Sequence, residues 1–385
     1  MAKTARLASI DAVRGAVMII MALDHVRDFI HRGAMSFSPT DLSQTTPVLF
    51  FTRWITHFCA PVFMFTAGMG AFLWWRNGRT RGQLSTFLLT RGFWLIVLEL
   101  TVMQIAYDFG FSKSNPILLV VLWALGACMV VLAALVWLPE SVLAIVSVGM
   151  IALHNLGDGV TSRLWISLHQ SGAIVIGGMT VVSAYPLIPW IGVMALGFCF
   201  GRLYTIDAGR RERILLTTGT AMIAAFLVLR WMNVYGDPVR WSAQKLPALS
   251  FLNCTKYPPS LDFLLMTLGP AMFALVWFER HPPAFPNPLI VFGRVPLFYF
   301  VLHFFAAHLI AAALALLRYG SPAWSFIFHP IPSMGGPRDL FPSGFGYDLW
   351  VAYAVWISIV VGLYPLCRRF AMLKASRRDW WLSYL

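Results

Sequence analysis

The first hydrophobic segment carries polar residues at spacings that suit chemistry inside a membrane. It reads IDAVRGAVMIIMALDHVRDFIH from Ile10 to His31. Arg14 and His25 are about three helical turns apart, so both side chains return to nearly one face, roughly 16 Å apart along the axis. An Asp at the depth of Asp24 costs on the order of 3 kcal/mol by insertion scales. Asp24 therefore requires a partner or a function.

The same segment places further carboxylates beside these residues. Asp28 is i+3 from His25 and could hold its imidazole in one tautomer. Asp11 is i+3 from Arg14 and could pair with it at the membrane border. A histidine with a tuned pKa can remove a proton from a hydroxyl or an amine, or it can accept an acyl group itself. The competing interpretation is a polar seam used only in helix packing.

The second segment, RWITHFCAPVFMFTAG, supplies another histidine candidate. Arg53 and His57 are spaced i,i+4 and share a helical face. Pro61 leaves the carbonyl of His57 without its helical donor, which predicts a local kink that presents polar groups to a cavity. His57 is therefore a second candidate catalytic residue. Arg53 could instead extend to the outer headgroups.

Two later segments contain ionisable residues that need partners. Arg91 and Glu99 lie two turns apart on one segment, too far for direct pairing, so each is expected to contact another helix. Arg91 could also contact an anionic cofactor. Lys256 and Tyr257 precede Pro258-Pro259, where a helix N-terminus would attract anions.

His303, in FGRVPLFYFVLH, lies near mid-membrane and is a secondary candidate for the catalytic histidine.

Other sequence features limit the possible functions. The chain lacks a P-loop, a GxGxxG opening a helix, a GxSxG elbow and a HExxH motif, so nucleotide hydrolysis, Rossmann binding, serine hydrolysis and zinc proteolysis have no support. Its five cysteines are scattered without metal-type spacing. Neither a disulfide framework nor a metal site is predicted.

The composition indicates an integral membrane protein. Of 385 residues, 59% are hydrophobic and 12% are charged, against about 25% charged in ordinary soluble domains. The net charge of +13 is spread in short clusters between hydrophobic segments, as orientation signals are. We therefore expect a lipid bilayer as the partner and no nucleic acid.

The hydrophobic pattern predicts an all-α polytopic bundle with about ten transmembrane helices in a single domain, 1–385. The predicted segments are 10–31, 47–75, 84–107, 116–137, 141–156, 186–204, 211–233, 259–279, 288–317 and 348–371. The inner loops carry roughly twice as many Lys and Arg residues as the outer loops, which places both termini in the cytoplasm. The longer loops, 32–46, 157–185, 234–258 and 318–347, would then face outward and could form an acceptor site.

The motifs IDAVRGAVMIIMALDHVRDF, FTRWITHFCAPVFMFTAG, KYPPSLDF and FGRVPLFYFVLH resemble bacterial membrane proteins of the heparan-alpha-glucosaminide N-acetyltransferase catalytic-domain family. The Arg-to-His spacing of the first segment is shared with the acyltransferase-3 membrane enzymes. The resemblance implies that acetyl-CoA or another acyl-CoA binds from the cytoplasm and that its acyl group passes to a sugar or glycan on the other face. It also implies a multi-pass protein of the bacterial inner membrane, a possible homodimer, and no metal.

Carried onto this chain, the resemblance makes His25 the central catalytic residue, with Asp24 orienting or polarising it. Arg14 would support the site or the CoA moiety, and Arg53 and His57 are the next candidates. In the lysosomal enzyme that names the family, the catalytic histidine lies between the first two motifs, where this chain has His31. The alternative function is a proton-coupled secondary transporter of a small organic anion, since buried ionisable residues suit proton relays equally well.

Overall fold

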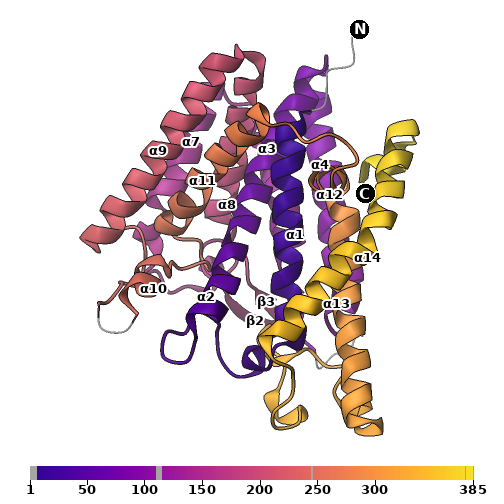
Figure 1. Cartoon of the computed structure of the whole chain (residues 1–385). Coiled ribbons are helices and arrows are strands. Elements are labelled where there is room, and N and C mark those ends of the chain that lie inside the picture. Colours follow the sequence, from indigo (N-terminus) through magenta and orange to yellow (C-terminus); the bar gives the residue numbers. More distant parts are fainter. Residues whose placement is uncertain (1–6, 110–114, 244–245, 378, 385) are drawn as a thin grey trace.

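The computed structural model describes residues 7–109, 115–243, 246–377 and 379–384, and long helices dominate it (Figure 1). Its α-helices are α1 (Ala8–Ile30), α2 (Pro47–Trp54), α3 (Cys59–Arg76), α4 (Arg81–Leu98), α5 (Gln104–Asp108), α6 (Val121–Leu135), α7 (Glu140–Leu153), α8 (Leu187–Gly201), α9 (Ala208–Met232), α10 (Pro247–Leu252), α11 (Leu261–Arg280), α12 (Pro288–Arg294), α13 (Pro296–Tyr319) and α14 (Leu349–Ser376). Short helical turns join several of them, including η2 (Ile55–Phe58), η3 (Glu99–Met103), η4 (His154–Gly157), η6 (Arg202–Thr205) and η10 (Trp380–Tyr384).

Eight helical stretches are long and apolar enough to cross a membrane. They are Pro47–Arg76, Arg81–Asp108, Glu140–Gly157, Leu187–Thr205, Ala208–Met232, Leu261–Arg280, Pro296–Tyr319 and Leu349–Ser376. Helix α1 has the length but carries several charged side chains, and α6 is apolar but shorter. Each of the ten predicted segments therefore contains a helix, and the predicted helical membrane bundle is confirmed.

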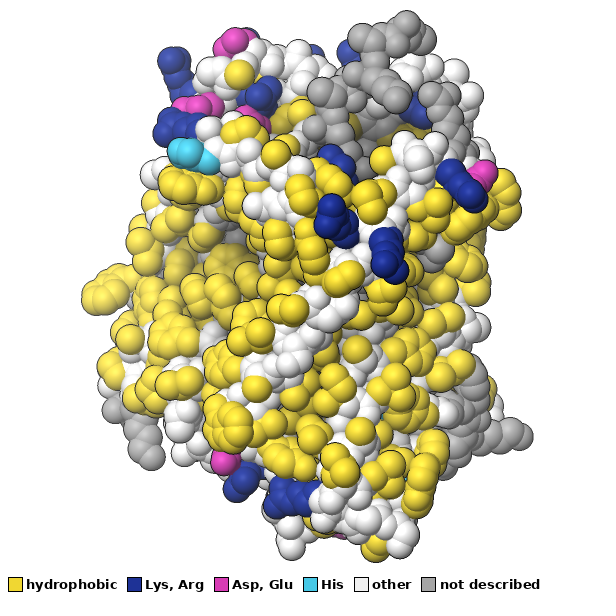
Figure 2. Space-filling model, turned by 45° about the vertical axis from the view of Figure 1, so that its right-hand side comes forward, with side chains coloured by type: hydrophobic (Ala, Val, Ile, Leu, Met, Phe, Trp, Pro, Cys, Tyr) yellow, Lys and Arg dark blue, Asp and Glu magenta, His cyan; other side chains and the backbone are white. Residues whose placement is uncertain are grey.

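A hydrophobic band surrounds the bundle. Figure 2 shows hydrophobic side chains over the middle of one face and charged side chains gathered toward the two ends. Large apolar side chains on the outer helices are widely exposed, among them Trp231 at 73% and Leu317 at 83%. An apolar surface of this extent is stable only against lipid or another apolar partner. The band therefore marks the part of the bundle that lies in the membrane.

Helix α1 occupies the centre of the bundle, in contact with α3, α11, α12, α13 and α14 (Figure 1). Two glycines allow its close crossing with α12. A Cβ atom on Gly15 would lie 1.8 Å from the carbonyl oxygen of Leu289, and one on Gly293 would lie 1.8 Å from that of Asp11. Only glycine permits this backbone contact. Helix α1, which carries five charged residues, is thereby held away from lipid.

The two ends of the bundle differ in the length of their connections. Helix α1 begins and α14 ends at one end, which we call the N-terminal end (Figure 1). The longer connections, which include α10 and strands β2 (Gly172–Ile176) and β3 (Met179–Ser183), gather at the other end, which we call the loop end. Both described ends of the chain thus lie on the same side of the bundle, as the predicted topology requires.

A small sheet at the loop end was not predicted. Its strand order is β1-β3-β2, where β1 (Ile117–Leu119) runs parallel to β3 and β2 runs antiparallel to it. Residues 157–185 were expected to be a loop, and 116–137 was expected to be helical from its start. The signal for the hairpin is the pair Gly177-Gly178, both at positive φ, between runs rich in Val and Ile. The strand pattern is short and lies between two long apolar helices, so it was not recognised in the sequence.

Two predicted helix boundaries also need correction. The segment 288–317 is divided into α12 and α13, because Pro296 has no N–H to continue the ladder. Helix α11 begins at Leu261, capped by Ser260, and not at Pro258-Pro259. These two breaks determine where Arg294 and Lys256 lie in the site described next.

Candidate functional site

A large cavity lies beside the N-terminal half of α1. Its volume is about 880 Å³, and its walls come from α1, α3, α4, α6, η6, α12, α13, α14 and η10. The wall is mostly apolar, but five basic residues also line it: Arg14, Arg76, Arg91, Arg294 and Lys374. Asp11 is the one carboxylate among the described lining residues. The cavity therefore combines an apolar wall with an excess of positive charge.

The basic side chains are held in place by the walls of the cavity. Arg14 donates to the hydroxyl of Thr66 at 3.1 Å and to the carbonyl oxygen of the same residue. Arg91 lies over the ring of Phe87 at 4.4 Å and that of Tyr384 at 5.6 Å. Arg294 approaches Asp11, with 3.7 Å between Nε and the carboxylate oxygen. Arg14 and Arg91, both predicted to bind the cofactor, thus line one cavity.

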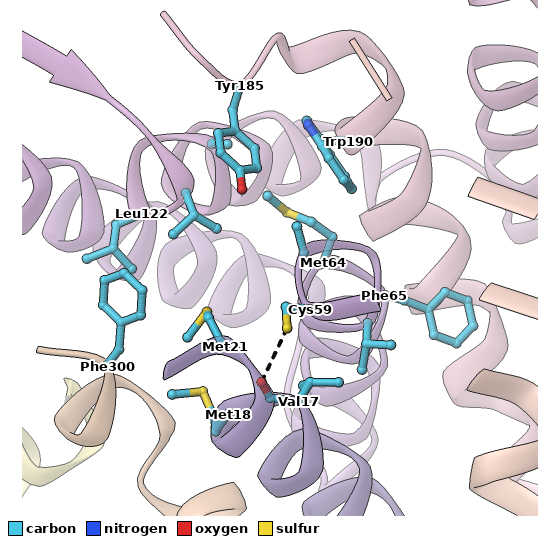
Figure 3. Close-up of a cluster of buried hydrophobic side chains, with 14 of the residues drawn as sticks. Val17, Met18, Met21, Cys59, Met64, Phe65, Leu122, Tyr185, Trp190 and Phe300 are labelled. Carbon is cyan, nitrogen blue, oxygen red and sulfur yellow. Dashed lines mark hydrogen bonds between the residues drawn. The ribbon is translucent and has the colours of Figure 1, made fainter. Parts of the chain in front are cut away.

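Apolar side chains close the inner end of the cavity. Figure 3 shows Met18, Met21, Leu122 and Phe300 directed toward one another, and all four line the cavity. On the adjoining segment of α3, the thiol of Cys59 is hydrogen-bonded to the carbonyl oxygen of Val17 at 3.4 Å (Figure 3). The cavity therefore narrows from a basic region at the N-terminal end to an apolar region near the middle of the bundle.

His25 lies directly behind this inner wall. Its ring packs edge-on to Phe300 at 6.2 Å, against Phe304 at 4.3 Å and on His303 at 5.3 Å between centroids. Both of its ring nitrogens are buried and have no hydrogen-bond partner among the described residues. The imidazole is thus held by ring packing alone, and His303, the secondary candidate, is its neighbour.

Asp24 has arginine partners. Its carboxylate accepts from Arg53 of α2, and Arg27 lies 3.0 Å from it one turn along α1. Arg27 also pairs with Asp28 at 2.5 Å. The hydrogen bond expected between Asp28 and His25 is therefore not formed, and Asp24 does not orient the His25 ring by a hydrogen bond, because the two carboxylates bind arginines. Arg53 extends inward to Asp24 and not to headgroups.

His57 lies at the predicted kink. The helix of the second segment tightens into η2 at Ile55–Phe58, where the carbonyl freed by Pro61 is located. The His57 ring is buried, packs against Phe263 at 5.3 Å, and has no partner for Nδ1 among the described residues. Arg53 lies close enough for its charge to act on this ring. His57 therefore belongs to the cluster around Asp24.

Lys256 and Tyr257 complete this cluster from the loop end. The Lys256 ammonium lies 5.2 Å from the Tyr257 ring, and its charge acts on Asp24 and His57. Tyr257 accepts a hydrogen bond from Tyr185. Burial alone would raise the pKa of Tyr257, but Lys256, Arg53 and this hydrogen bond together hold the pKa below its ordinary value. We call Asp24, Arg27, Arg53, His57, Lys256 and Tyr257 the loop-end cluster.

The expected anion site at the start of α11 is not available. The N–H of Leu261 donates to Asn155, that of Asp262 to the carbonyl of Gly236, and that of Phe263 to the Ser260 hydroxyl. The first-turn donors that would have bound an anion are thus used within the protein. Lys256 and Tyr257 therefore act through their side chains.

The predicted site residues fall into two groups. Arg14 and Arg91 line the cavity, whereas Arg53, Lys256 and Tyr257, predicted alongside them as cofactor-binding residues, are not among its lining residues. His25 lies between the groups. His31, the other candidate histidine, ends α1 and pairs by its backbone with Tyr347 at the loop end. The five residues predicted to bind the cofactor therefore lie in two separate regions.

Several residues of the site were not predicted. Arg27 is i+3 from Asp24, a spacing visible in the sequence, but it was not given a role. Arg76, Arg294 and Lys374 were given no role in a site, yet all three line the cavity. Tyr185 carries no local signal, because its contact with Tyr257 joins segments far apart in the chain. Glu99 does meet another helix, as expected, by accepting from the N–H of Leu122 at 2.8 Å.

Comparison with known protein families gives one match. The family model described as "Heparan-alpha-glucosaminide N-acetyltransferase, catalytic" matches residues 6–233. This range contains Arg14, Asp24, His25, Arg53 and His57, and it ends before α11. No curated protein matches the chain.

Proposed function

The chain belongs to the heparan-alpha-glucosaminide N-acetyltransferase catalytic family, and on this premise we propose that it is a membrane-embedded acyltransferase. It would move an acetyl or other acyl group from acyl-CoA, bound at the N-terminal end, to a sugar or glycan acceptor at the loop end. The charge bias of the loops supports a cytoplasmic N-terminal end, and we place the protein in a bacterial inner membrane.

The observation that carries this proposal is the basic cavity beside α1. CoA presents a pyrophosphate and a further phosphate on one end of a long, partly apolar arm, and guanidinium groups match phosphate geometry. Arg14, Arg76, Arg91, Arg294 and Lys374 line the outer part of the cavity, and apolar side chains line its inner part. A volume of about 880 Å³ lies in the range of cavities that hold small-molecule cofactors.

The inner end of the cavity directs the thioester toward His25. Met21 and Phe300 line the cavity, and the Phe300 ring contacts the His25 ring. A small movement of Phe300 would open the imidazole to the cavity. Because neither ring nitrogen of His25 has a partner among the described residues, both are available for proton transfer or attack. His25 is therefore the group we assign to the reacting carbonyl.

The transfer can follow either of two balanced routes. In the direct route, His25 removes the proton of the acceptor hydroxyl or amine, whose oxygen or nitrogen bonds to the thioester carbon while the carbon–sulfur bond breaks. The imidazolium then returns the proton to the CoA thiolate. In the covalent route, a His25 nitrogen takes the acyl group, CoA leaves as the thiol, and the acceptor then displaces the imidazole.

The loop-end cluster is suited to positioning the acceptor. Lys256, Tyr257 and His57 offer donors and a rigid face on the side of His25 away from the CoA cavity, and their charges act on one another. Asp24 ties this cluster to α1 through Arg53. A sugar bound here would present its hydroxyl or amine toward the middle of the bundle.

The test is acyl transfer by the purified protein with labelled acetyl-CoA and a panel of sugars and amino sugars. Wild type should turn over acetyl-CoA repeatedly only with an acceptor present, and His25→Ala should not exceed the background rate. Equal background rates for both proteins over the whole panel would overturn the proposal. Solute uptake into proteoliposomes driven by a pH gradient, without CoA release, would instead establish the transporter. Retention of labelled acyl group on the denatured protein would distinguish the covalent route from the direct one.

A further inference from the structure

We propose that His154, Asp158 and His169 form a binding site for Zn²⁺ or a similar divalent transition-metal ion. The three residues come from η4, which continues α7, and from the segment that precedes β2 at the loop end. Each offers one ligand atom, and these atoms all lie within 4.8 Å of one another. No metal site was predicted, because the cysteines have no metal-type spacing and these two histidines are fifteen residues apart in the sequence.

The donor set is one that binds zinc. Two imidazoles and a carboxylate leave one coordination position for water, as in many zinc sites. A tetrahedral ion with bonds of about 2.1 Å separates its ligand atoms by about 3.4 Å, so these donors would need to move by only on the order of 1 Å. His169 Nε2 and Asp158 Oδ1 are already 2.9 Å apart.

The histidine nitrogens are left without partners in a buried setting. His154 is 7% exposed and His169 is fully buried, yet both ring nitrogens of His154 and Nδ1 of His169 lack a hydrogen bond among the described residues. Buried polar atoms are rarely left unpaired, because each then loses its hydrogen bonds to water without replacement. A bound cation would satisfy His154 directly. The hydrogen bond between His169 and Asp158 alone does not explain why His154 is placed beside them.

The neighbours of the three residues form the support that metal sites need. The amide of Asn155 donates to the second carboxylate oxygen of Asp158 at 2.9 Å, and Gln170 donates to the Asp158 carbonyl at 3.1 Å. The Trp165 ring packs against the His169 ring. Such contacts fix the orientation of metal ligands. The partly exposed Asp158 gives an ion access from the loop end.

An ion at this position would link the end of α7 to the segments that contact the starts of α8 and α11. Asn155 accepts from the N–H of Leu261 at the start of α11. The carbonyls of Ser167 and Leu168 accept from Leu187 and Ile188 at the start of α8. The ion would therefore join the end of α7 to the segment that holds α8, and it would stiffen the loop end from which Tyr185 reaches the loop-end cluster.

The experiment measures zinc bound to the full-length protein after tag removal and treatment with a chelator. Wild type should take up about one zinc ion per chain, and its thermal unfolding temperature should rise with zinc. His154→Ala should bind zinc at least about tenfold more weakly and show no such rise. Because the His154 ring makes no hydrogen bond to any residue that the structure describes, this variant should fold like wild type without metal.

Two further variants make the result specific. His281→Ala removes an exposed histidine at the end of α11 and should bind zinc as wild type does. Asp158→Asn keeps the size of the side chain and should weaken zinc binding. No saturable zinc uptake by wild type, or equal uptake by wild type and His154→Ala, would overturn the site. The readout is independent of acyl transfer, so its failure and the failure of the proposed activity are distinguishable.

Discussion

The two polar regions along α1 differ in their balance of charge and in their openness. The cavity at the N-terminal end is open, and its five basic residues face one carboxylate among the described lining residues. The loop-end cluster is closed, and with the adjoining Asp28 its charges are nearly balanced: Asp24 and Asp28 lie beside Arg27, Arg53 and Lys256. One helix supplies residues to both regions.

This difference indicates two different uses of buried charge. A surplus of positive charge in an open cavity attracts an anion, because an incoming phosphate supplies the missing negative charge. A balanced cluster attracts no ion strongly, but its paired groups hold neighbouring helices in register. We therefore expect changes in the cavity to affect acyl-CoA binding and changes at His25 to affect chemistry. Changes in the cluster should affect folding, in addition to the proposed positioning of the acceptor.

The largest effect is expected from Asp24→Ala. The change leaves Arg53 and Arg27 buried without their shared carboxylate, which costs about 3–5 kcal/mol when one partner of a buried pair is removed. We expect a lower unfolding temperature and little folded protein, measured by thermal unfolding in detergent. Asp41→Asn, at an exposed carboxylate in the loop after α1, is the control and should behave as wild type. If Asp24→Ala unfolds like wild type, the cluster does not hold the bundle together.

The next effect separates the candidate histidines. His25→Gln should lower the rate of acyl transfer by about 10²–10⁴-fold, the usual contribution of a general acid or base. It should change stability little, because the His25 nitrogens make no hydrogen bond among the described residues. His57→Gln and His31→Gln are the matched variants, assayed with the same acceptor. A larger loss of acyl-transfer rate in either of these variants than in His25→Gln would mean that His57 or His31, and not His25, is the reacting group.

A smaller effect is expected from Arg91→Met in the cavity. Loss of one phosphate contact should weaken acyl-CoA binding about tenfold, equivalent to about 1.4 kcal/mol, with the maximal rate preserved. The measurement is equilibrium binding of CoA at two salt concentrations, since the loss should shrink as salt screens the charges. Arg210→Met removes an exposed arginine that does not line the cavity and serves as the control. Equal weakening by both variants would mean that general surface charge, and not the cavity, attracts CoA.

The sequence predicted most of the fold because its information is local. Ten apolar segments and their flanking charges suffice to place membrane helices, and Pro61 suffices to place the kink at His57. The short sheet was missed because five Val and Ile residues around Gly177-Gly178 give a weak signal beside twenty-residue helices. Helix boundaries failed at Pro258-Pro259, where Ser260 supplies the cap.

The site was harder to predict because it depends on contacts between distant segments. Spacing on one helix correctly grouped Arg14, Asp24 and His25 on α1, but it assigned Asp28 to His25. On α1 the Asp28 carboxylate could have reached either His25 or Arg27, and in the structure it contacts Arg27. The pairing of Asp24 with Arg53 and that of Tyr185 with Tyr257 join different elements, so no spacing rule could have found them.

The smallest effect concerns Tyr257, and it tests the electrostatics of the loop-end cluster directly. Its pKa is held below the ordinary value of about 10, so one tyrosine should ionise earlier than the others as pH rises. The measurement is the near-ultraviolet absorbance of tyrosinate, and the early step should disappear in Tyr257→Phe. Lys256→Met should move the step to higher pH because it removes a positive charge, whereas Lys256→Arg should leave it in place. Since the lowered pKa favours the ionised folded state, wild type should gain stability over Tyr257→Phe as pH rises through that step. An unchanged titration in Lys256→Met would mean that Lys256 does not act on Tyr257, and the loop-end cluster would then be smaller than the structure indicates.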